Sequence, residues 1–193
     1  VIDDVLKLAQ HRSHSLSQLS DAEVLMVAVS AALYFRNHQE RTLYVMGRMG
    51  YLSGHLSISR FNRRLHKLRD WLEMVLLVLS EVLAEQSVYI IDSLPLPVCH
   101  RARAGRCRKV RGADYRGYCA AKDERFFGWR LHLICTPQGL PVAFSVLPAA
   151  YHDLTPVHDL TYGLPAGALL VADKAYNSGK DEASILAHTG VRL

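Results

Sequence analysis

The amino-acid sequence predicts a mixed α/β fold, in which a helical N-terminal region precedes a domain built around a sheet. Through residues 1–87 apolar side chains recur at helical spacing, and beyond them short apolar runs alternate with turn residues. Two of those runs, residues 88–91 and 168–172, have strand composition. Each run ends at an aspartate, Asp92 and Asp173 respectively. The first domain is therefore expected to end where the helical spacing stops.

The helical region contains a helix start and a long amphipathic pattern. Residues 20–23, Ser-Asp-Ala-Glu, supply an N-cap with a carboxylate three residues later. The apolar spacing over residues 59–83 predicts one long helix or two joined helices. The segment 51–64 fits a helix-turn-helix with a basic reading helix, and it fits a helical bundle with a solvated basic face equally well. Under the first interpretation the DNA-binding side chains are Arg60, Arg63 and Arg64.

Residues 88–193 show the element order of a mixed sheet. A strand at 88–92 is followed by a basic insert, a hairpin, a helix, and then a second strand and helix. This order is the beginning of a ribonuclease-H-like layout, truncated at its C-terminal end, with antiparallel strands one to three and the two aspartates on neighbouring strands. The expected bounds are 127–135 and 140–147 for the hairpin strands, 153–163 for a helix capped by Asp153, 168–173 for the next strand and 177–188 for the last helix.

Positive charge is concentrated between the two aspartates. The chain has a net charge of +5, and residues 101–130 alone hold ten basic and three acidic side chains, which is a net charge of +7. Few acids can pair with this run, glycines space it, and tyrosines able to stack on bases follow it. We therefore predict that this segment contacts nucleic acid. The side chains assigned to that contact are Arg106, Arg108, Lys109, Arg111, Tyr115 and Arg116.

The two aspartates predict a metal-dependent reaction. A carboxylate at the end of a buried strand is costly to desolvate unless a positive charge lies beside it. Two carboxylates on neighbouring strands repel each other, and a divalent cation relieves that repulsion. Because a strongly basic segment lies between them in the chain, Asp92 and Asp173 indicate metal-dependent chemistry on a phosphodiester backbone.

Composition excludes several other classes of protein. Half of the residues are hydrophobic and 21% are charged, as in ordinary globular proteins. The longest apolar stretches are far too short to span a bilayer, and no secretory-type signal opens the chain, so a cytoplasmic location without a membrane partner is expected. No C-x-x-C pair is present, so we expect reduced thiols and no structural zinc site. The cysteines are Cys99, Cys107, Cys119 and Cys135.

Five short motifs of the second domain occur together in one known family. They are residues 90–99 (IIDSLPLPVC), 115–118 (YRGY), 128–133 (GWRLHL), 147–153 (LPAAYHD) and 172–176 (ADKAY). In this order they resemble the catalytic core of DDE-type bacterial insertion-sequence transposases, most closely insertion sequence family 982. The resemblance is specific over the whole second domain and looser over the helical region.

The resemblance implies a DNA transposase that cuts and joins the ends of its element. Asp92 and Asp173 match the family's first two acids, which hold two Mg²⁺ or Mn²⁺ ions, with Asp92 bridging both. The third acid, a glutamate on a later helix, would fall beyond Leu193. Glu182 is a poor substitute, because it belongs to the helix directly after the second acid. Terminal inverted repeats and target DNA are the implied partners, and a homo-oligomer is expected for the full-length protein.

Four further side chains are close to these acids in the sequence or in the expected sheet. Lys174 and Tyr176 follow the second aspartate and are assigned to contact with the scissile DNA backbone. His132 lies in a strand, where a histidine is usually structural. His152 precedes a helix N-terminus, which can meet phosphate. The interpretation leaves the roles of the two histidines open.

Two other functions fit the same residues. A truncated copy without the third acid would bind element ends without cutting them, and a host ribonuclease-H-like nuclease would share the fold and the acids. We expect the 193-residue chain to bind DNA and to cut it poorly, because the second metal position needs the missing glutamate. An in-frame continuation reaching a glutamate-bearing helix would favour the enzyme. Flanking inverted repeats would distinguish a transposase from a host nuclease.

Overall fold

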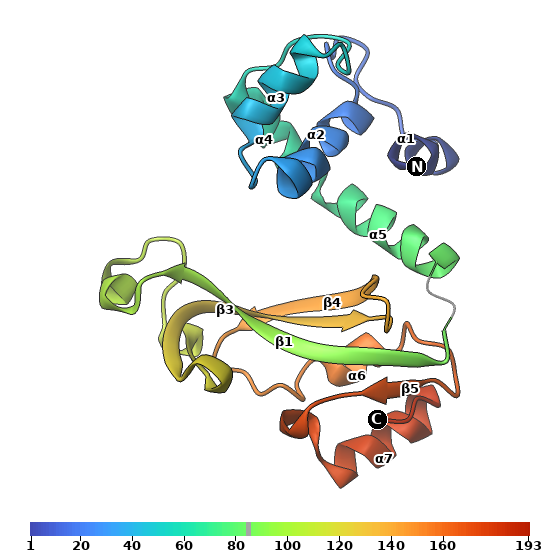
Figure 1. The fold of residues 1–193 in the computed structure, drawn as a ribbon, viewed down its shortest axis with the longest axis vertical. Helices are drawn as coiled ribbons and strands as arrows, with labels where there is room; N and C mark the ends of the chain where they lie inside the picture. The colour runs from blue at the N-terminus through green and yellow to red at the C-terminus, as the bar shows by residue number, and fades with distance from the viewer. Residues whose placement is uncertain (84–85) are drawn as a thin grey trace. The chain divides into compact units, whose positions relative to one another are not determined.

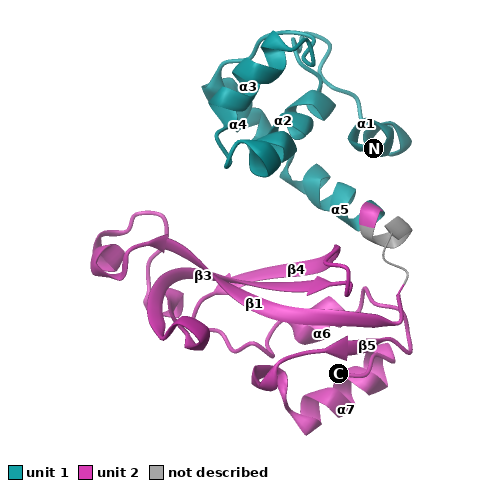
Figure 2. Cartoon of the chain, viewed as in Figure 1, with its two compact units in different colours: residues 1–78 teal, residues 79–193 magenta. Residues whose placement is uncertain are grey.

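The structure is a computed structural model that describes residues 1–193 except 84 and 85, and the side chains of residues 80–83 are also outside the description. The chain divides into two compact units, residues 1–78 and 79–193, which Figure 2 shows in different colours. Each unit has its own hydrophobic core. The two units are therefore described one at a time.

The N-terminal unit is built from helices around one apolar core, in which Leu19, Leu25 and Phe61 are fully buried. The amphipathic pattern predicted over residues 59–83 forms two helices, which meet at the buried Leu68. The second of these helices crosses the division between the units, which therefore lies earlier than the predicted boundary. The helices are α1 (Ile2–Leu8), α2 (Asp21–Tyr34), α3 (Gln39–Arg48), α4 (Ile58–Lys67) and α5 (Arg69–Leu83), as labelled in Figure 1.

A capping box starts α2 where the sequence predicts it. The Ser20 hydroxyl accepts a hydrogen bond from the backbone N–H of Glu23 at 3.1 Å, and the Ser20 N–H donates to the Glu23 carboxylate at 2.6 Å. The same carboxylate accepts from the backbone N–H and the hydroxyl of Ser53, at 2.5 and 2.8 Å. Glu23 therefore satisfies the first turn of α2 and ties the loop between α3 and α4 to it.

The C-terminal unit is organised around one mixed five-stranded sheet. β3 pairs antiparallel with β1, β2 and β4, and β1 pairs parallel with β5. The prediction of a mixed sheet with antiparallel first strands is confirmed. The strands are β1 (Val88–Cys99), β2 (Arg116–Cys119), β3 (Glu124–Cys135), β4 (Pro141–Pro148) and β5 (Leu169–Val171).

Helices cover one face of this sheet. Side chains alternate along β1, so that Tyr89 and Ile91 point into the core with Leu170 of β5. Helix α6 (Val157–Thr161) and helix α7 (Gly179–Thr189) supply further members of the same core, including Leu160 and Ile185. The core of the unit therefore lies between the sheet and these two helices.

The other face of the sheet carries apolar side chains that are more than a third exposed. They belong to β1, β4 and β5, and Asp92 lies on the same face of β1. Within the described residues no helix is long and apolar enough to cross a membrane. The exposed apolar residues of this face are Ile90, Leu94, Leu96, Phe144, Val146, Leu169 and Val171.

Two expectations about individual elements were wrong. Strand β1 does not stop at Asp92 but runs to Cys99, because β3 continues to pair with it as far as Phe127. The basic insert, for which no elements were predicted, contains short 3₁₀ turns, strand β2 and the start of β3. Helix α6 begins at Val157 and not at Asp153, because the Asp153 carboxylate pairs with Arg130 in place of capping a helix.

At Gly128, strand β3 lies too close to the backbone of β1 to leave room for a side chain. A Cβ on this residue would lie 2.2 Å from the carbonyl oxygen of Leu96 and 2.8 Å from the nitrogen of Val98, both in the backbone of β1. Gly128→Ala should therefore force the two central strands apart and lower the free energy of unfolding by about 1–3 kcal/mol. Gly163→Ala is the control, because its Cβ would meet nothing within 4 Å. Urea unfolding followed by circular dichroism checks the difference, and equal midpoints for the two variants would contradict it.

Candidate active site

Asp92 lies within β1, and Asp173 lies just beyond the end of β5, the strand that pairs parallel with β1. β1 and β5 pair Val88 with Leu169 and Ile90 with Val171. Asp92 and Asp173 each come two residues after the last of these pairs, and both are exposed. Side chains two residues apart in a strand share a face, so Asp92 is on the same face of β1 as Ile90. Two residues separated by 81 positions in the sequence therefore both follow the short pairing of β1 with β5.

Each carboxylate keeps oxygen atoms free for a ligand. One oxygen of Asp92 accepts from the backbone N–H of Ser93 at 2.7 Å. One oxygen of Asp173 accepts from the backbone N–H of Ala175 at 2.9 Å and so caps the 3₁₀ turn η4 (Lys174–Tyr176). These backbone bonds orient the two side chains without neutralising them. The pair can therefore offer negatively charged oxygen to a third group.

The chemistry of this donor set fits a hard divalent cation. Mg²⁺ takes one or two protein carboxylates and completes its shell with water and substrate oxygens. Within the described part of the chain no cluster of three or more His, Cys, Asp or Glu residues is placed to hold a metal. The carboxylates at the start of α7 have other partners. Glu182 accepts from the Ser178 N–H at 3.2 Å, and Asp181 pairs with His158 at 3.3 Å. Asp92 and Asp173 could thus hold one cation as a pair.

A buried polar network lies on the core face of the sheet. His132 of β3 is fully buried, and its Nδ1 lies 3.3 Å from the Tyr176 hydroxyl and 3.9 Å from Oδ1 of Asp153. Arg130 donates to both oxygens of Asp153, at 2.9 and 3.2 Å, and to the carbonyl oxygen of Tyr118 at 2.9 Å. Burial lowers the pKa of His132 despite the nearby Asp153 charge. The imidazole is therefore neutral near pH 7.

The structure corrects the prediction for Tyr176. Its side chain is 1% exposed and packs in the core, so it cannot touch a DNA backbone. Burial, and after it the negative charge of Asp153, raises the pKa of its hydroxyl, which stays protonated.

Lys174, two residues earlier, is exposed as a DNA contact requires. His152 is exposed in a turn, where its Nδ1 accepts from the N–H of Leu154 at 3.2 Å.

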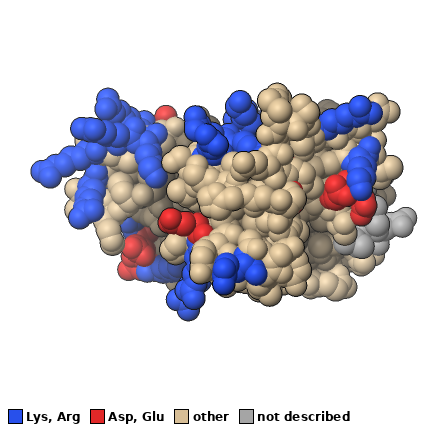
Figure 3. All heavy atoms as spheres, turned by 90° about the horizontal axis from the view of Figure 1, so that it is seen from above, with Lys and Arg blue, Asp and Glu red and all other residues tan. Residues whose placement is uncertain are grey.

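The basic segment forms a charged surface of the C-terminal unit. We call the exposed side chains of Arg106, Arg108, Lys109, Arg111 and Arg116 the basic surface. Among the described residues none of them forms an ion pair with a carboxylate, so their charge is available to a partner. In Figure 3 Lys and Arg side chains gather at the left end, the end at which Figure 1 shows the connection between β1 and β2.

One side chain in this region differs from its predicted environment. Tyr115 is half-buried, and its ring lies edge-on against Trp129 at 4.9 Å, so its faces are less available for stacking than predicted. Cys99 and Cys107 are free, partly buried thiols. Backbone N–H groups of Val110 and Lys109 lower the pKa of Cys107.

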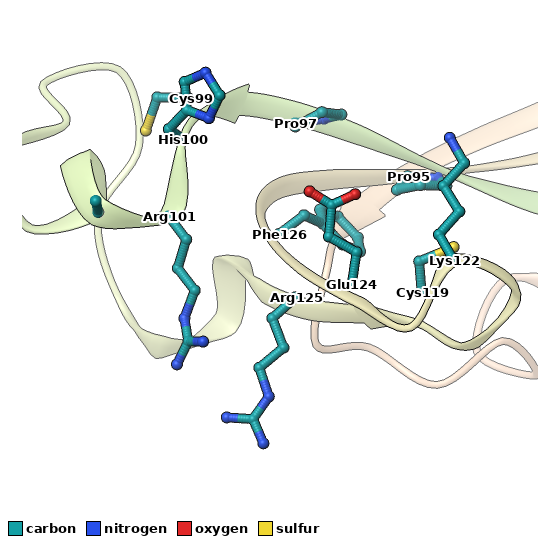
Figure 4. Close-up of a pocket in the computed structure, with 11 residues that line it drawn as sticks. Pro95, Pro97, Cys99, His100, Arg101, Cys119, Lys122, Glu124, Arg125 and Phe126 are labelled. Carbon is teal, nitrogen blue, oxygen red and sulfur yellow. The ribbon is translucent and has the colours of Figure 1, made fainter.

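A hollow of about 560 Å³ opens beside the end of β1. It is lined by apolar side chains such as Phe126, by the carboxylate of Glu124, and by the basic side chains of Arg101, Lys122 and Arg125 (Figure 4). Lys122 and Arg125 belong to the basic segment 101–130 that is predicted to contact nucleic acid, but they were not named among its individual contact residues. Only the fold shows that they line the same hollow as Arg101.

The basic side chains of α4 divide into two kinds. Arg60 and Arg63 are exposed. Arg64 was predicted to bind DNA, but it donates to the carbonyl oxygen of Leu19 at 2.8 Å and pairs with the carboxylate of Asp21. Burial raises the pKa of Asp21, but hydrogen bonds from Arg64 and from His11 outweigh it, so the pKa is lowered. Arg64 is therefore a structural residue.

Comparison with known proteins agrees with this geometry. The family described as Transposase DDE domain matches residues 83–193, which is more than half of the chain. A domain of this family suggests a metal-dependent DNA-processing enzyme. The chain belongs to the DDE transposase family. The DDE-type resemblance is confirmed at this level, and insertion sequence family 982 stays a prediction. No curated protein and no solved structure matches the chain.

The two kinds of arginine on α4 give a matched pair of variants. Arg64→Ala should lower the free energy of unfolding by about 1–3 kcal/mol, because it leaves the mostly buried Asp21 carboxylate without its charged donor. Arg63→Ala, on the same helix, should leave stability within about 0.5 kcal/mol. Thermal unfolding of both variants checks this. A stable Arg64→Ala protein with weakened DNA binding would restore the original assignment.

Proposed function

We propose that this chain is a transposase that cuts and joins DNA at the ends of a mobile element, with Asp92 and Asp173 as the metal-binding acids of its active site. The observation that supports the proposal is the register of β1 and β5 in a member of the DDE transposase family, because Asp92 and Asp173 each come two residues after the last pair of that register. The antiparallel order of β1, β3 and β4 with β5 parallel to β1 supports a ribonuclease-H-like identity for the sheet.

The carboxylate pair supplies the metal-binding part of this site. Mg²⁺ or Mn²⁺ bound there would activate an attacking water or 3′-hydroxyl and stabilise the leaving 3′-oxygen. The chain itself orients the two acids, through the N–H groups of Ser93 and Ala175. Lys174 is exposed directly after Asp173, where it can neutralise a phosphate oxygen of the bound strand.

DNA is held, in this proposal, by exposed arginines and lysines of the C-terminal unit. The basic surface carries no compensating carboxylates, so contact with phosphates releases counterions and does not break internal ion pairs. Arg101, Lys122 and Arg125 around the neighbouring hollow extend this surface (Figure 4). Inverted repeats and target DNA are the expected partners, homo-oligomerisation of the full-length protein is part of the proposal, and so is a cytoplasmic location.

The active-site assignment is tested by amide substitutions that keep shape and remove charge. Asp92→Asn and Asp173→Asn should each weaken Mn²⁺ binding by at least about tenfold, roughly 1.4 kcal/mol, since a neutral amide repels no neighbour and attracts no cation. DNA binding without metal should be unchanged. Isothermal titration with Mn²⁺ and a nicking assay on supercoiled DNA provide the measurements. Glu182→Gln is the control, because that carboxylate caps α7. Unchanged Mn²⁺ affinity in both Asn variants would falsify the assignment.

The DNA-binding assignment is tested by salt dependence. Each phosphate contact contributes roughly 0.9 to the slope of log affinity against log salt concentration. Changing Arg106, Arg108 and Arg111 to Ala should therefore lower the slope by up to about 2.7, three times that contribution, and weaken binding on all DNA sequences alike. The control is Arg69→Ala, because Arg69 is exposed but pairs with Asp70. An unchanged slope in the triple variant would move the DNA surface to Arg60, Arg63 and their neighbours on α4.

A further inference from the structure

The strand ladder alone does not hold the second aspartate in place. β5 pairs with β1 through three residues only, and the last pair joins Ile90 to Val171. Asp173 lies two residues beyond that pair, in the cap of η4. A further interaction must therefore fix the separation between Asp173 and Asp92.

Tyr176 anchors the far end of η4 in the core. Its N–H donates to the carbonyl oxygen of Asp173 at 3.2 Å, so the two residues belong to one hydrogen-bonded turn. The Tyr176 side chain is 1% exposed, and its hydroxyl lies 3.3 Å from Nδ1 of the fully buried His132. A buried hydroxyl that loses its partner is costly, so this hydrogen bond favours one position of η4.

The same network reaches the other aspartate through Ser93. Ser93 follows Asp92 in β1 and lies opposite His132 in the register of β1 and β3. Its hydroxyl lies 3.5 Å from Nη1 of Arg130, the nitrogen that also binds Asp153. One buried network therefore connects the backbone next to Asp92 with the turn that starts at Asp173.

The remaining members of the network keep His132 in place. Nδ1 of His132 is 3.9 Å from Oδ1 of Asp153, and Arg130 holds both oxygens of Asp153. Arg130 is itself tied to the carbonyl oxygen of Tyr118 in β2. Tyr176 and Asp153 thus both lie on the Nδ1 side of the imidazole, where Arg130 fixes the Asp153 carboxylate and with it the polar surroundings of the His132–Tyr176 pair.

We propose that Tyr176 and His132 are positioning residues, whose hydrogen bond sets the Asp173 carboxylate at the distance from Asp92 that a shared divalent cation needs. This inference rests on the proposed function, because a fixed separation matters only if both acids bind the same ion. Neither side chain touches the cation or the DNA. They act through the backbone of η4, as outer residues around metal sites act through the ligands that they orient.

The first measurement needs no metal. In hydrogen–deuterium exchange of the full chain, Tyr176→Phe should speed exchange of the amides of residues 175–177 by roughly fivefold or more, the loss expected for one hydrogen bond. The ring stays in the core, so the fold should be kept and the melting temperature should fall by only a few degrees. Tyr162→Phe is the control, because Tyr162 is 66% exposed. Exchange equal to that of the control would overturn the anchoring role of the hydroxyl.

The second measurement links the anchor to the ion. Titration with Mn²⁺ should show about tenfold weaker binding for Tyr176→Phe, a loss of the size seen when outer residues of metal sites are removed. His132→Leu should behave in the same way, and His132→Asn should recover part of the affinity, because its amide can reach the hydroxyl. The double variant Tyr176→Phe/His132→Leu should be no weaker than either single variant.

The outcomes separate this inference from the proposed function. Loss of Mn²⁺ binding in Asp92→Asn, with wild-type affinity in Tyr176→Phe, would leave the active site in place and overturn the positioning role. Equal Mn²⁺ binding by the wild type and Asp92→Asn would overturn the site itself, and with it the positioning role at that site. In that case, faster amide exchange in Tyr176→Phe would still show that the Tyr176 hydroxyl holds η4 in place, but this anchor would have no role in cation binding.

Discussion

The parallel pairing of β1 with β5 is the constraint on which the candidate site depends. Three residue pairs bring together segments that are about eighty positions apart, and Asp92 and Asp173 each come two residues after the last of those pairs. A slip of one residue would turn one carboxylate to the opposite face of the sheet. The helices α6 and α7 cover the core face, which fixes the register through Tyr89, Ile91 and Leu170. Packing on one face of the sheet therefore determines the chemistry available on the other.

Charged residues in this protein fall into two groups with different roles. Arg64 and Arg130 are largely buried, each holds a carboxylate, and each connects distant segments through a backbone carbonyl. The arginines and the lysine of the basic surface are exposed and have no acid beside them among the described residues. The first group stabilises each unit, because breaking a buried pair leaves a charge without a partner. The second group contributes little to folding and leaves its charge for phosphate.

A buried polar network lies beside the hydrophobic core of the C-terminal unit. His132, Asp153 and Tyr176 come from three separate elements, and the hydrogen bonds of His132 with Tyr176 and of Arg130 with Asp153 can form only when β3, the turn before α6 and η4 are all in place. Polar groups buried in this way specify one arrangement, because alternatives leave donors or acceptors unpaired. Such a network is suited to hold exposed acids at a fixed separation, since it lies beneath them and takes no part in binding.

The sequence by itself determined the class of fold, the two aspartates and the basic segment, because strand composition, charge density and local spacing are properties of neighbouring residues. It also predicted the capping box of Ser20 and Glu23, which is a contact over three residues. Only the tertiary structure decided which polar side chains are exposed. Arg64 and Tyr176 are residue types that often contact DNA. Within the fold, however, Arg64 pairs with Asp21 and the Tyr176 hydroxyl hydrogen-bonds His132. Those partners lie more than forty positions away, and no local pattern encodes a contact of that range.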